Sequence, residues 1–348
     1  MVHVRRAEQN KQPGVCYAVT TDGLELPVVD VTHPAFAVEL SEDNQARLVA
    51  RFLEEQRRFA RLPGWLRLVM MRFFLRGSRI ARGLRRAEGT FLDGMTTYLF
   101  KLGPQNLGSY AVPADRVILR SLPAISVRLR VRDMARLLAD ELATRLAAEP
   151  GRPLCFINIA GGPAIDSLNA LILLQREAPE SLHGRRVDIR VLDEDDGGPA
   201  FGARALVALQ ARGAPLAGLD VHFEHRRYDW RSVDGLGAVL ESSRVEGAVV
   251  AVSSEGGLFE YGSDRDIVEN LRVLSAGTHA RVFVVGSVTR DDDVIRTLKL
   301  TSTAATRPRG LAAFSRLVGG AGFRVVRSVA RPLSDQVVLV PDPNAAYA

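Results

Sequence analysis

The sequence is poor in cysteine and has no long apolar run, and both scarcities restrict the class of protein. Only Cys16 and Cys155 occur among 348 residues, so neither a disulfide framework nor a cysteine-based zinc site is expected. No apolar run reaches the roughly 18 residues that a membrane-spanning helix requires. Residues 7–14 lack the apolar segment of a secretory signal. We therefore expect a cytoplasmic protein with no metal site.

Lysine and aromatic residues are also scarce. Only three of the 46 basic residues are lysines (Lys11, Lys101 and Lys299), an imbalance that codon bias explains more simply than selection for phosphate binding. The formal net charge is +6, and the excess lies in the first 150 residues, mostly between Arg47 and Arg86. Aromatic residues make up 6% of the chain, which is few for a protein that stacks on unpaired bases. We expect no nucleic-acid partner.

A strand, a turn of small residues and a helix follow one another after residue 153. Residues 154–159 (LCFINI) are apolar except Asn158, as in a central parallel strand that is covered on both faces. The next residues lack bulk where the backbone has to turn, and residues 167–178 then form a strong helical pattern. Such a turn directs unpaired N–H groups toward a ligand crevice. Its small residues are Ala160, Gly161, Gly162 and Ala164.

Strands and helices alternate through the rest of the chain, which predicts an α/β fold with a doubly wound, mostly parallel sheet. The last two strands are too close together in sequence for a crossover connection, so we expect an antiparallel hairpin. The predicted strands are residues 154–159, 187–192, 220–224, 247–252, 281–285, 323–329 and 336–340, and the predicted helices between them are residues 167–178, 200–212, 265–274 and 311–318.

Residues from about 150 to 341 resemble a class I S-adenosylmethionine-dependent methyltransferase domain. That family has a seven-stranded sheet whose last strand is antiparallel. Its first strand leads into an acid and three glycines at alternate positions; here these positions hold Asn158, Ala160, Gly162 and Ala164. The resemblance implies S-adenosylmethionine as the cofactor.

The resemblance also implies site residues. Asp193 would bind the ribose hydroxyls, Asp229 would accept from the adenine amino group, and Trp230 would stack on the ring. The remaining cofactor-binding candidates are Asn158, Ala160, Gly161, Gly162, Ala164 and Ser253. Glu255 and His225 are the candidates for catalysis, as a base or an orienting group. Asp166 is predicted to cap the following helix.

The N-terminal part does not match the methyltransferase core. We expect a β-hairpin (residues 15–19 and 24–29) and then helices over residues 44–62, 65–76, 90–102 and 133–148. Pro150 marks the boundary between residues 1–149 and residues 150–348. We expect the first part to be the β-hairpin plus a helical cap whose residues 41–148 wall the substrate pocket, and the second part to fold without them. The arginine-rich helices suit a membrane surface, nucleic acid, or a solvated face whose apolar side packs on the core. We predict the last.

The predicted function is methyl transfer to the oxygen or nitrogen of a small organic acceptor, mainly by positioning. Two alternatives stay open. A catalytically silent methyltransferase-like domain would serve as a partner or scaffold protein. A nicotinamide-dependent oxidoreductase would also use a glycine turn, but the G-x-G-x-x-G pattern is absent.

Overall fold

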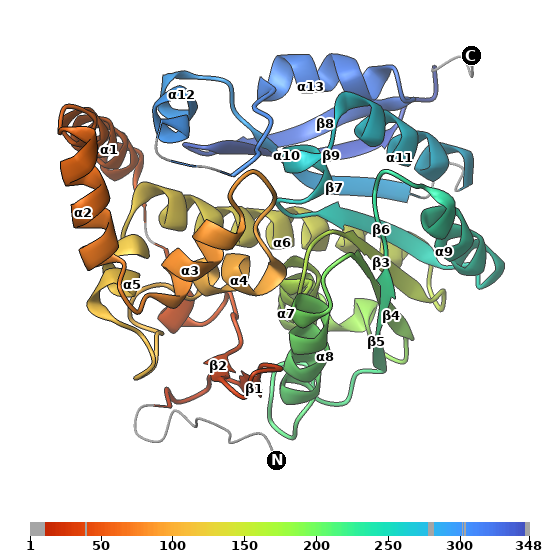
Figure 1. The fold of residues 1–348 in the computed structure, drawn as a ribbon. Helices are drawn as coiled ribbons and strands as arrows, with labels where there is room; N and C mark the ends of the chain where they lie inside the picture. Colours follow the sequence, from red (N-terminus) through yellow and green to blue (C-terminus); the bar gives the residue numbers. More distant parts are fainter. Residues whose placement is uncertain (1–10, 39, 278–281, 301, 303, 345–348) are drawn as a thin grey trace.

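A computed structural model describes residues 11–344 except 39, 278–281, 301 and 303. Its centre is a seven-stranded sheet with the order β5-β4-β3-β6-β7-β9-β8 (Figure 1). The strands β3 to β7 run parallel, and β9 is antiparallel to both of its neighbours, β7 and β8. The predicted fold class is confirmed. The strands are β3 (Leu154–Ile159), β4 (Val187–Asp193), β5 (Val221–Arg227), β6 (Val249–Ser254), β7 (Val282–Thr289), β8 (Phe323–Ala330) and β9 (Ser334–Pro341).

Helices cover both faces of this sheet because its central strands are apolar on both sides. The residues of β3, β4, β6 and β7 are all buried. One hydrophobic core joins the sheet to α6 (Leu122–Ala148), α7 (Ile165–Glu177) and α8 (Gly197–Leu209). A second core joins the other face to α9 (Asp234–Val245), α11 (Asp264–Gly277) and α13 (Gly310–Gly319). The result is a three-layered α/β/α sandwich.

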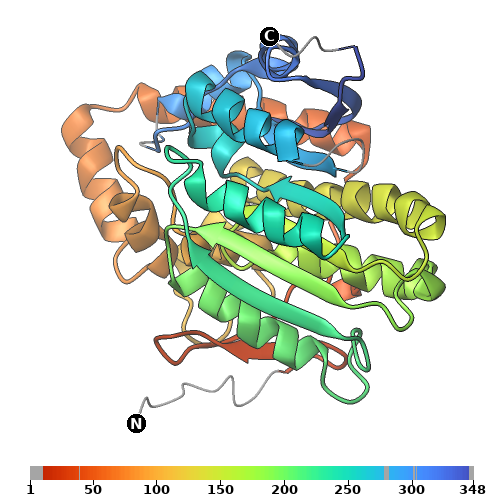
Figure 2. The same ribbon diagram turned by 90° about the vertical axis from the view of Figure 1, so that its right-hand side faces the viewer.

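The N-terminal part adds a hairpin and a group of helices. The hairpin of β1 (Tyr17–Val19) and β2 (Glu25–Pro27) is antiparallel, as predicted, and packs beside α8 (Figure 2). The cap, by which we mean residues 41–120, then begins with Ser41, whose hydroxyl accepts from the Asn44 N–H. Its helices are α1 (Glu42–Ala60), α2 (Gly64–Phe74), α3 (Arg79–Arg86), α4 (Gly94–Leu102) and α5 (Pro113–Ile118).

The long helix α6 belongs to the sheet as much as to the N-terminal part. Its buried residues, among them Leu138, Leu142 and Leu146, share one core with Leu154 and Phe156 of β3. Removing residues 41–148 would therefore uncover one face of the sheet, and we expect the apolar surface so exposed to destabilise the remainder. The predicted boundary at Pro150 separates two elements, α6 and β3, that share this core.

The sequence patterns did not predict several helices. These are α3, α5, α9, α10 (Leu258–Tyr261) and α12 (Asp293–Lys299). Of the predicted strand over residues 281–285, Arg281 lies outside the described residues, and the strand itself runs on to Thr289. In the described part of the chain, no helix combines the length and apolar character needed to cross a membrane.

Candidate functional site

The turn after β3 is held in a left-handed backbone conformation. Ala160 and Ala164 have φ values of 54° and 51°, and Gly162 between them has 57°. Left-handed backbone costs an L-residue such as alanine roughly 1 kcal/mol or more, so the surrounding structure has to impose it. These three residues stand at the three glycine positions of the family pattern, and all of them use the backbone region that glycine adopts most easily.

A buried polar cluster supports this turn from below. The Asn158 amide donates to Asp166 Oδ1 and to Ser253 Oγ, at 2.9 Å each. Asp166 does not cap α7, contrary to the prediction, because the helix begins at Ile165 and Ala164 holds the N-cap position. Burial, reinforced by the charge of Glu255, raises the pKa of Asp166. Gly161 of the turn packs against the Asn158 side chain, so the cluster joins the turn to α7 and β6.

A small cavity of about 30 Å³ lies above the turn, and we call it the turn cavity. Its floor and one wall come from the ends of β3, β4 and β6, and the cap supplies the opposite wall through α4 and the loop before it. There Gly94, the first residue of α4, rests on Gly162. The lining residues are Phe91, Leu92, Asp93, Gly94, Thr97, Lys101, Ala160, Gly161, Gly162, Asp193, Glu194, Asp195, Trp230, Glu255, Gly256, Gly257 and Tyr261.

Asp193 ends β4 beside the turn, where the prediction places it. One carboxylate oxygen accepts the Gly162 N–H at 2.8 Å, and the other accepts the Asp195 N–H at 2.9 Å. Burial raises the pKa of Asp193, although these two backbone donors oppose the rise. Each carboxylate oxygen has a second lone pair, so the side chain can still accept hydrogen bonds from a ligand.

Of the two residues predicted to bind the adenine ring, Trp230 lies at the turn cavity and Asp229 does not. Trp230 lines the turn cavity and packs edge-on against Phe91 of the cap, with ring centroids 5.6 Å apart. The ring centroids of Phe91 and Tyr261 are 6.3 Å apart, so three aromatic rings lie together in the wall of the turn cavity. Asp229 is not among the lining residues. It pairs with Arg231 at 2.8 Å, and the hydrogen bond from Arg231 lowers its pKa.

Glu255 is buried at the cavity wall between two cations. One oxygen pairs with Lys101 of α4, and the other accepts from Arg130 Nε of α6 at 2.8 Å. Burial alone would raise the pKa of Glu255, but Lys101 and Arg130 hold it below the usual value. A carboxylate so held is a weak base. Arg130 extends the network to Glu260 at 3.0 Å, and the whole group ties the cap and α6 to the sheet.

The sequence patterns missed Lys101 and Arg130. Lys101 is one of three lysines in an arginine-rich chain and lies within the apolar pattern of α4, which was the available signal. His225, the other catalytic candidate, lines neither this cavity nor the larger one described next. Its Nε2 lies 3.0 Å from the backbone oxygen of Asp193. It therefore steadies the end of β4.

A second and larger cavity, of about 420 Å³, adjoins the turn cavity, and we call it the cap cavity. The two share Leu92, Thr97, Gly256 and Tyr261 as lining residues. Most of the cap cavity is apolar, and helices from the cap and from the far end of the sheet form its walls. Its other lining residues include Leu75, Ala81, Leu84, Arg85, Glu88, Phe100, Ile118, Ser126, Val127, Arg130, Glu260, Ile295, Leu298 and Lys299.

No cluster of metal-ligating side chains occurs among the residues that the structure describes. Comparison by sequence finds neither a matching family model nor a matching curated protein.

Comparison by structure finds similar folds at low identity. A possible exported protein from Bordetella parapertussis is 20% identical, with a TM-score of 0.57 over 87% of this chain and 100% of that chain. Magnesium protoporphyrin IX methyltransferase from Synechocystis PCC 6803, crystallised with bound SAH, is 14% identical over 62% of this chain and 87% of that chain, with a TM-score of 0.39. The pyocyanin biosynthetic protein PhzM is 15% identical over 86% of this chain and 74% of that chain, with a TM-score of 0.40. At these identities the likeness concerns the fold alone.

Proposed function

We propose that this protein transfers a methyl group from S-adenosylmethionine to a small, largely apolar organic acceptor. The observation that carries the proposal is the junction of the two cavities. The turn cavity, which has both polar and apolar walls, adjoins a mostly apolar cavity at Thr97, Gly256 and Tyr261. A group-transfer enzyme needs two adjacent sites of this kind, so that donor and acceptor meet in a defined orientation.

The chemistry of the turn cavity suits the cofactor. Asp193 and Glu194 offer carboxylate oxygens for hydroxyl groups, Trp230 offers a ring for stacking, and Lys101 brings positive charge to the far wall. The small turn residues Gly161 and Gly162 let a ligand approach the backbone. The cavity is small because Gly94 rests on Gly162, and it would have to widen for the whole cofactor to enter. When bound, the cofactor supplies an already activated methyl group.

The residues of the chain would then act mainly by orientation and by excluding water. Glu255 is assigned to holding Lys101 and Arg130 in place, since both of its oxygens are engaged. Burial raises the pKa of Tyr261, so its hydroxyl stays protonated and available as a donor at the junction. The apolar walls of the cap cavity would hold the acceptor in a water-poor environment.

Calorimetric titration with S-adenosylmethionine and S-adenosylhomocysteine tests the cofactor part. We expect binding in the micromolar range for the intact chain, weakened by Asp193→Ala and unchanged by Asp220→Ala, a matched control on the exposed rim before β5. Absence of binding by a folded protein would overturn the proposal and favour a silent partner protein. One observation favours this alternative: the contact between Gly94 and Gly162 narrows the cavity over the turn.

The acceptor part has its own test. Ser126 lies in the wall of the cap cavity, and its hydroxyl is buried without a hydrogen-bond partner among the described residues. Ser126→Phe would place an aromatic ring in the cavity. We expect this variant to lose binding of N-phenyl-1-naphthylamine, a neutral apolar fluorophore, while it keeps its affinity for S-adenosylmethionine. Equal fluorophore binding by both proteins would contradict the assignment of this cavity.

A further inference from the structure

The helix α2 presents an apolar face to solvent. Trp65 and Phe73 are 70% and 74% exposed, and Val69 between them is 45% exposed. Residues four positions apart share one face of a helix, so these three side chains form a row. Met70 and Phe74, both 47% exposed, extend the row by one position. The prediction that the apolar side of the arginine-rich helices packs on the core is therefore wrong for α2.

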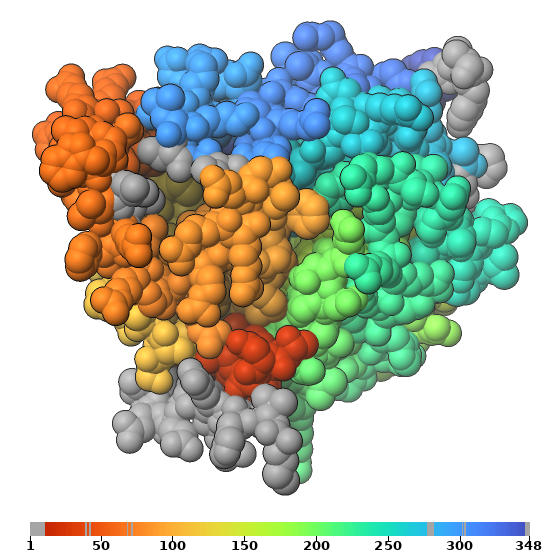
Figure 3. Space-filling view, in the orientation of Figure 1, coloured from red at the N-terminus to blue at the C-terminus, as the bar shows by residue number. Residues whose placement is uncertain are grey.

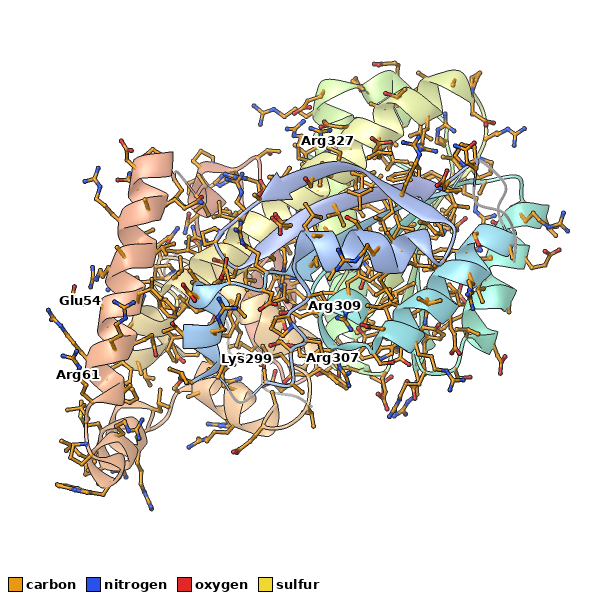
Figure 4. All side chains as sticks on the ribbon, turned by 90° about the horizontal axis from the view of Figure 1, so that it is seen from above. Glu54, Arg61, Lys299, Arg307, Arg309 and Arg327 are labelled. Carbon is orange, nitrogen blue, oxygen red and sulfur yellow. The ribbon has the colours of Figure 1, made fainter. Side chains whose placement is uncertain are left out.

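The helix also stands at the margin of the molecule. Figure 3 shows α1 and α2 forming a corner of the surface, away from the sheet. Glu54 and Arg61 lie on the outer side of α1, which gives that helix a charged surface of both signs (Figure 4). At this edge of the molecule no other helix covers the apolar row of α2 among the residues that the structure describes. An exposed apolar surface of this kind often marks an interaction site.

The charged residues of α2 and of the segments next to it in sequence are all arginines. Between Gln56 and Ala87 the sequence contains ten arginines and no acidic residue. Arg58 pairs with Glu54 and Arg79 with Asp22. Within the described part of the chain, no carboxylate lies at ion-pair distance from Arg67, Arg72 or Arg76. Arg67, Arg72 and Arg76 therefore place uncompensated positive charge beside the apolar row.

We propose that α2 docks this protein on the surface of an anionic lipid membrane. A helix with tryptophan, phenylalanine and aliphatic side chains on one face and arginine beside them is suited to lie in the interface between headgroups and acyl chains. Arginines gain from anionic headgroups, and tryptophan and phenylalanine gain from leaving water. Because α2 carries both arginines and large apolar side chains, an anionic membrane surface matches it on both counts.

Other occupants fit less well. A second copy of the chain would bring its own arginines against these and leave like charges facing each other. Nucleic acid would match the arginines but would leave Val69, Met70 and the phenylalanines without a partner, because phosphates and sugars offer no apolar surface.

The docking surface borders the cap cavity. Leu75, one residue beyond α2, and Leu84 and Arg85 of α3 line that cavity. Docking would bring its wall close to the lipid. If the proposed methyl transfer holds, an acceptor dissolved in the membrane would have a short path to the cap cavity; the docking itself does not depend on that activity.

Sedimentation with lipid vesicles tests the proposal. The vesicles contain either phosphatidylcholine alone or phosphatidylcholine with 30% phosphatidylglycerol. We expect binding to the anionic vesicles that weakens with salt, and at least roughly tenfold weaker binding for Trp65→Ser/Phe73→Ser. Arg67→Gln/Arg72→Gln/Arg76→Gln should weaken binding at least as much, because each basic residue near an anionic surface contributes roughly fivefold. Val245→Ser, at an equally exposed apolar site on α9, is the control and should bind as the unaltered chain does.

Several outcomes would overturn the proposal. One is equal binding to both kinds of vesicle, and another is no vesicle binding at all. A dimer that dissociates in the Trp65→Ser/Phe73→Ser variant, without vesicle binding, would assign the face to a second copy. Tighter binding to duplex DNA than to anionic vesicles would assign it to nucleic acid. Calorimetric titration with S-adenosylmethionine in the same variant separates this proposal from the methyl-transfer proposal, since docking and cofactor binding use different residues.

Discussion

Gly94 of the cap rests directly on Gly162 of the turn. A Cβ atom at Gly94 would lie 2.9 Å from Gly162 Cα and 3.2 Å from Gly198 Cα, so three backbone segments meet with no room for a side chain. The cap, the turn after β3 and the start of α8 are thereby fixed to one another. This contact sets the width of the cavity in which the cofactor is proposed to bind.

The Gly94→Ala substitution tests how tightly these segments are packed. We expect a loss of about 1–3 kcal/mol in the free energy of unfolding, because the added methyl group has to displace backbone atoms. Urea unfolding measures the loss. Gly237→Ala is the control: this glycine lies in α9 with open space around it, and alanine should be neutral or stabilising there. Equal stability of both variants would show that the three segments separate easily.

Replacement of Ala160 and Ala164, the two alanines with positive φ, should relieve backbone strain in the turn. We expect Ala160→Gly and Ala164→Gly to leave the free energy of unfolding unchanged or to raise it by up to about 1 kcal/mol, since glycine adopts positive φ without a steric penalty. Ala147→Gly, at an exposed position of α6, should instead lower it by roughly 0.5–1 kcal/mol. Thermal unfolding of the three variants gives the comparison. A loss at Ala160 as large as that at Ala147 would contradict the strained conformation.

The buried carboxylate of Glu255 should stabilise the fold through its two cations. Glu255→Gln removes the counter-charge of buried Lys101 and leaves Arg130 paired with Glu260 alone, so we expect a loss of about 3 kcal/mol in the free energy of unfolding. Adding Lys101→Met to this variant should recover part of the loss, and the double-mutant cycle measures the coupling.

The same carboxylate predicts a pH dependence. Because the folded-state pKa of Glu255 is lowered, its contribution is present above the unfolded-state pKa and is lost as the pH falls through the folded-state value. The free energy of unfolding of the unaltered chain should therefore fall more steeply on acidification than that of Glu255→Gln. Parallel curves would show that Glu255 does not titrate between the two states.

Affinity for S-adenosylmethionine should depend on the protonation of Asp193. Burial raises the pKa of this carboxyl group, and hydrogen bonds from ligand hydroxyls favour its ionised form. Affinity should therefore increase as the pH rises through the raised pKa and level off above it. Asp193→Asn should bind more weakly and show a flatter profile when calorimetric titrations are repeated across pH. A profile unchanged by the substitution would remove Asp193 from the cofactor site.

The sequence by itself determined which segments along the chain form the strands of the sheet, and where the turn after the first of them lies. Strands such as residues 154–159 are buried on both faces, so a continuous apolar run in the sequence identifies them. The close spacing of the last two strands allowed only a hairpin. Small residues after β3 marked the turn. Short helices such as α3 and α12 were not legible, because so few residues carry too little periodicity.

Only the tertiary structure decided what surrounds each candidate side chain. The ion pairs of Glu255 join residues more than a hundred positions apart, and no local pattern encodes such a contact. The exposure of Trp65 and Phe73 was equally hidden, because an amphipathic pattern shows which residues share a face but not what covers it. Burial and charge pairing are properties of the assembled layers, and in this protein they gave Glu255 a structural role and left α2 open to a partner.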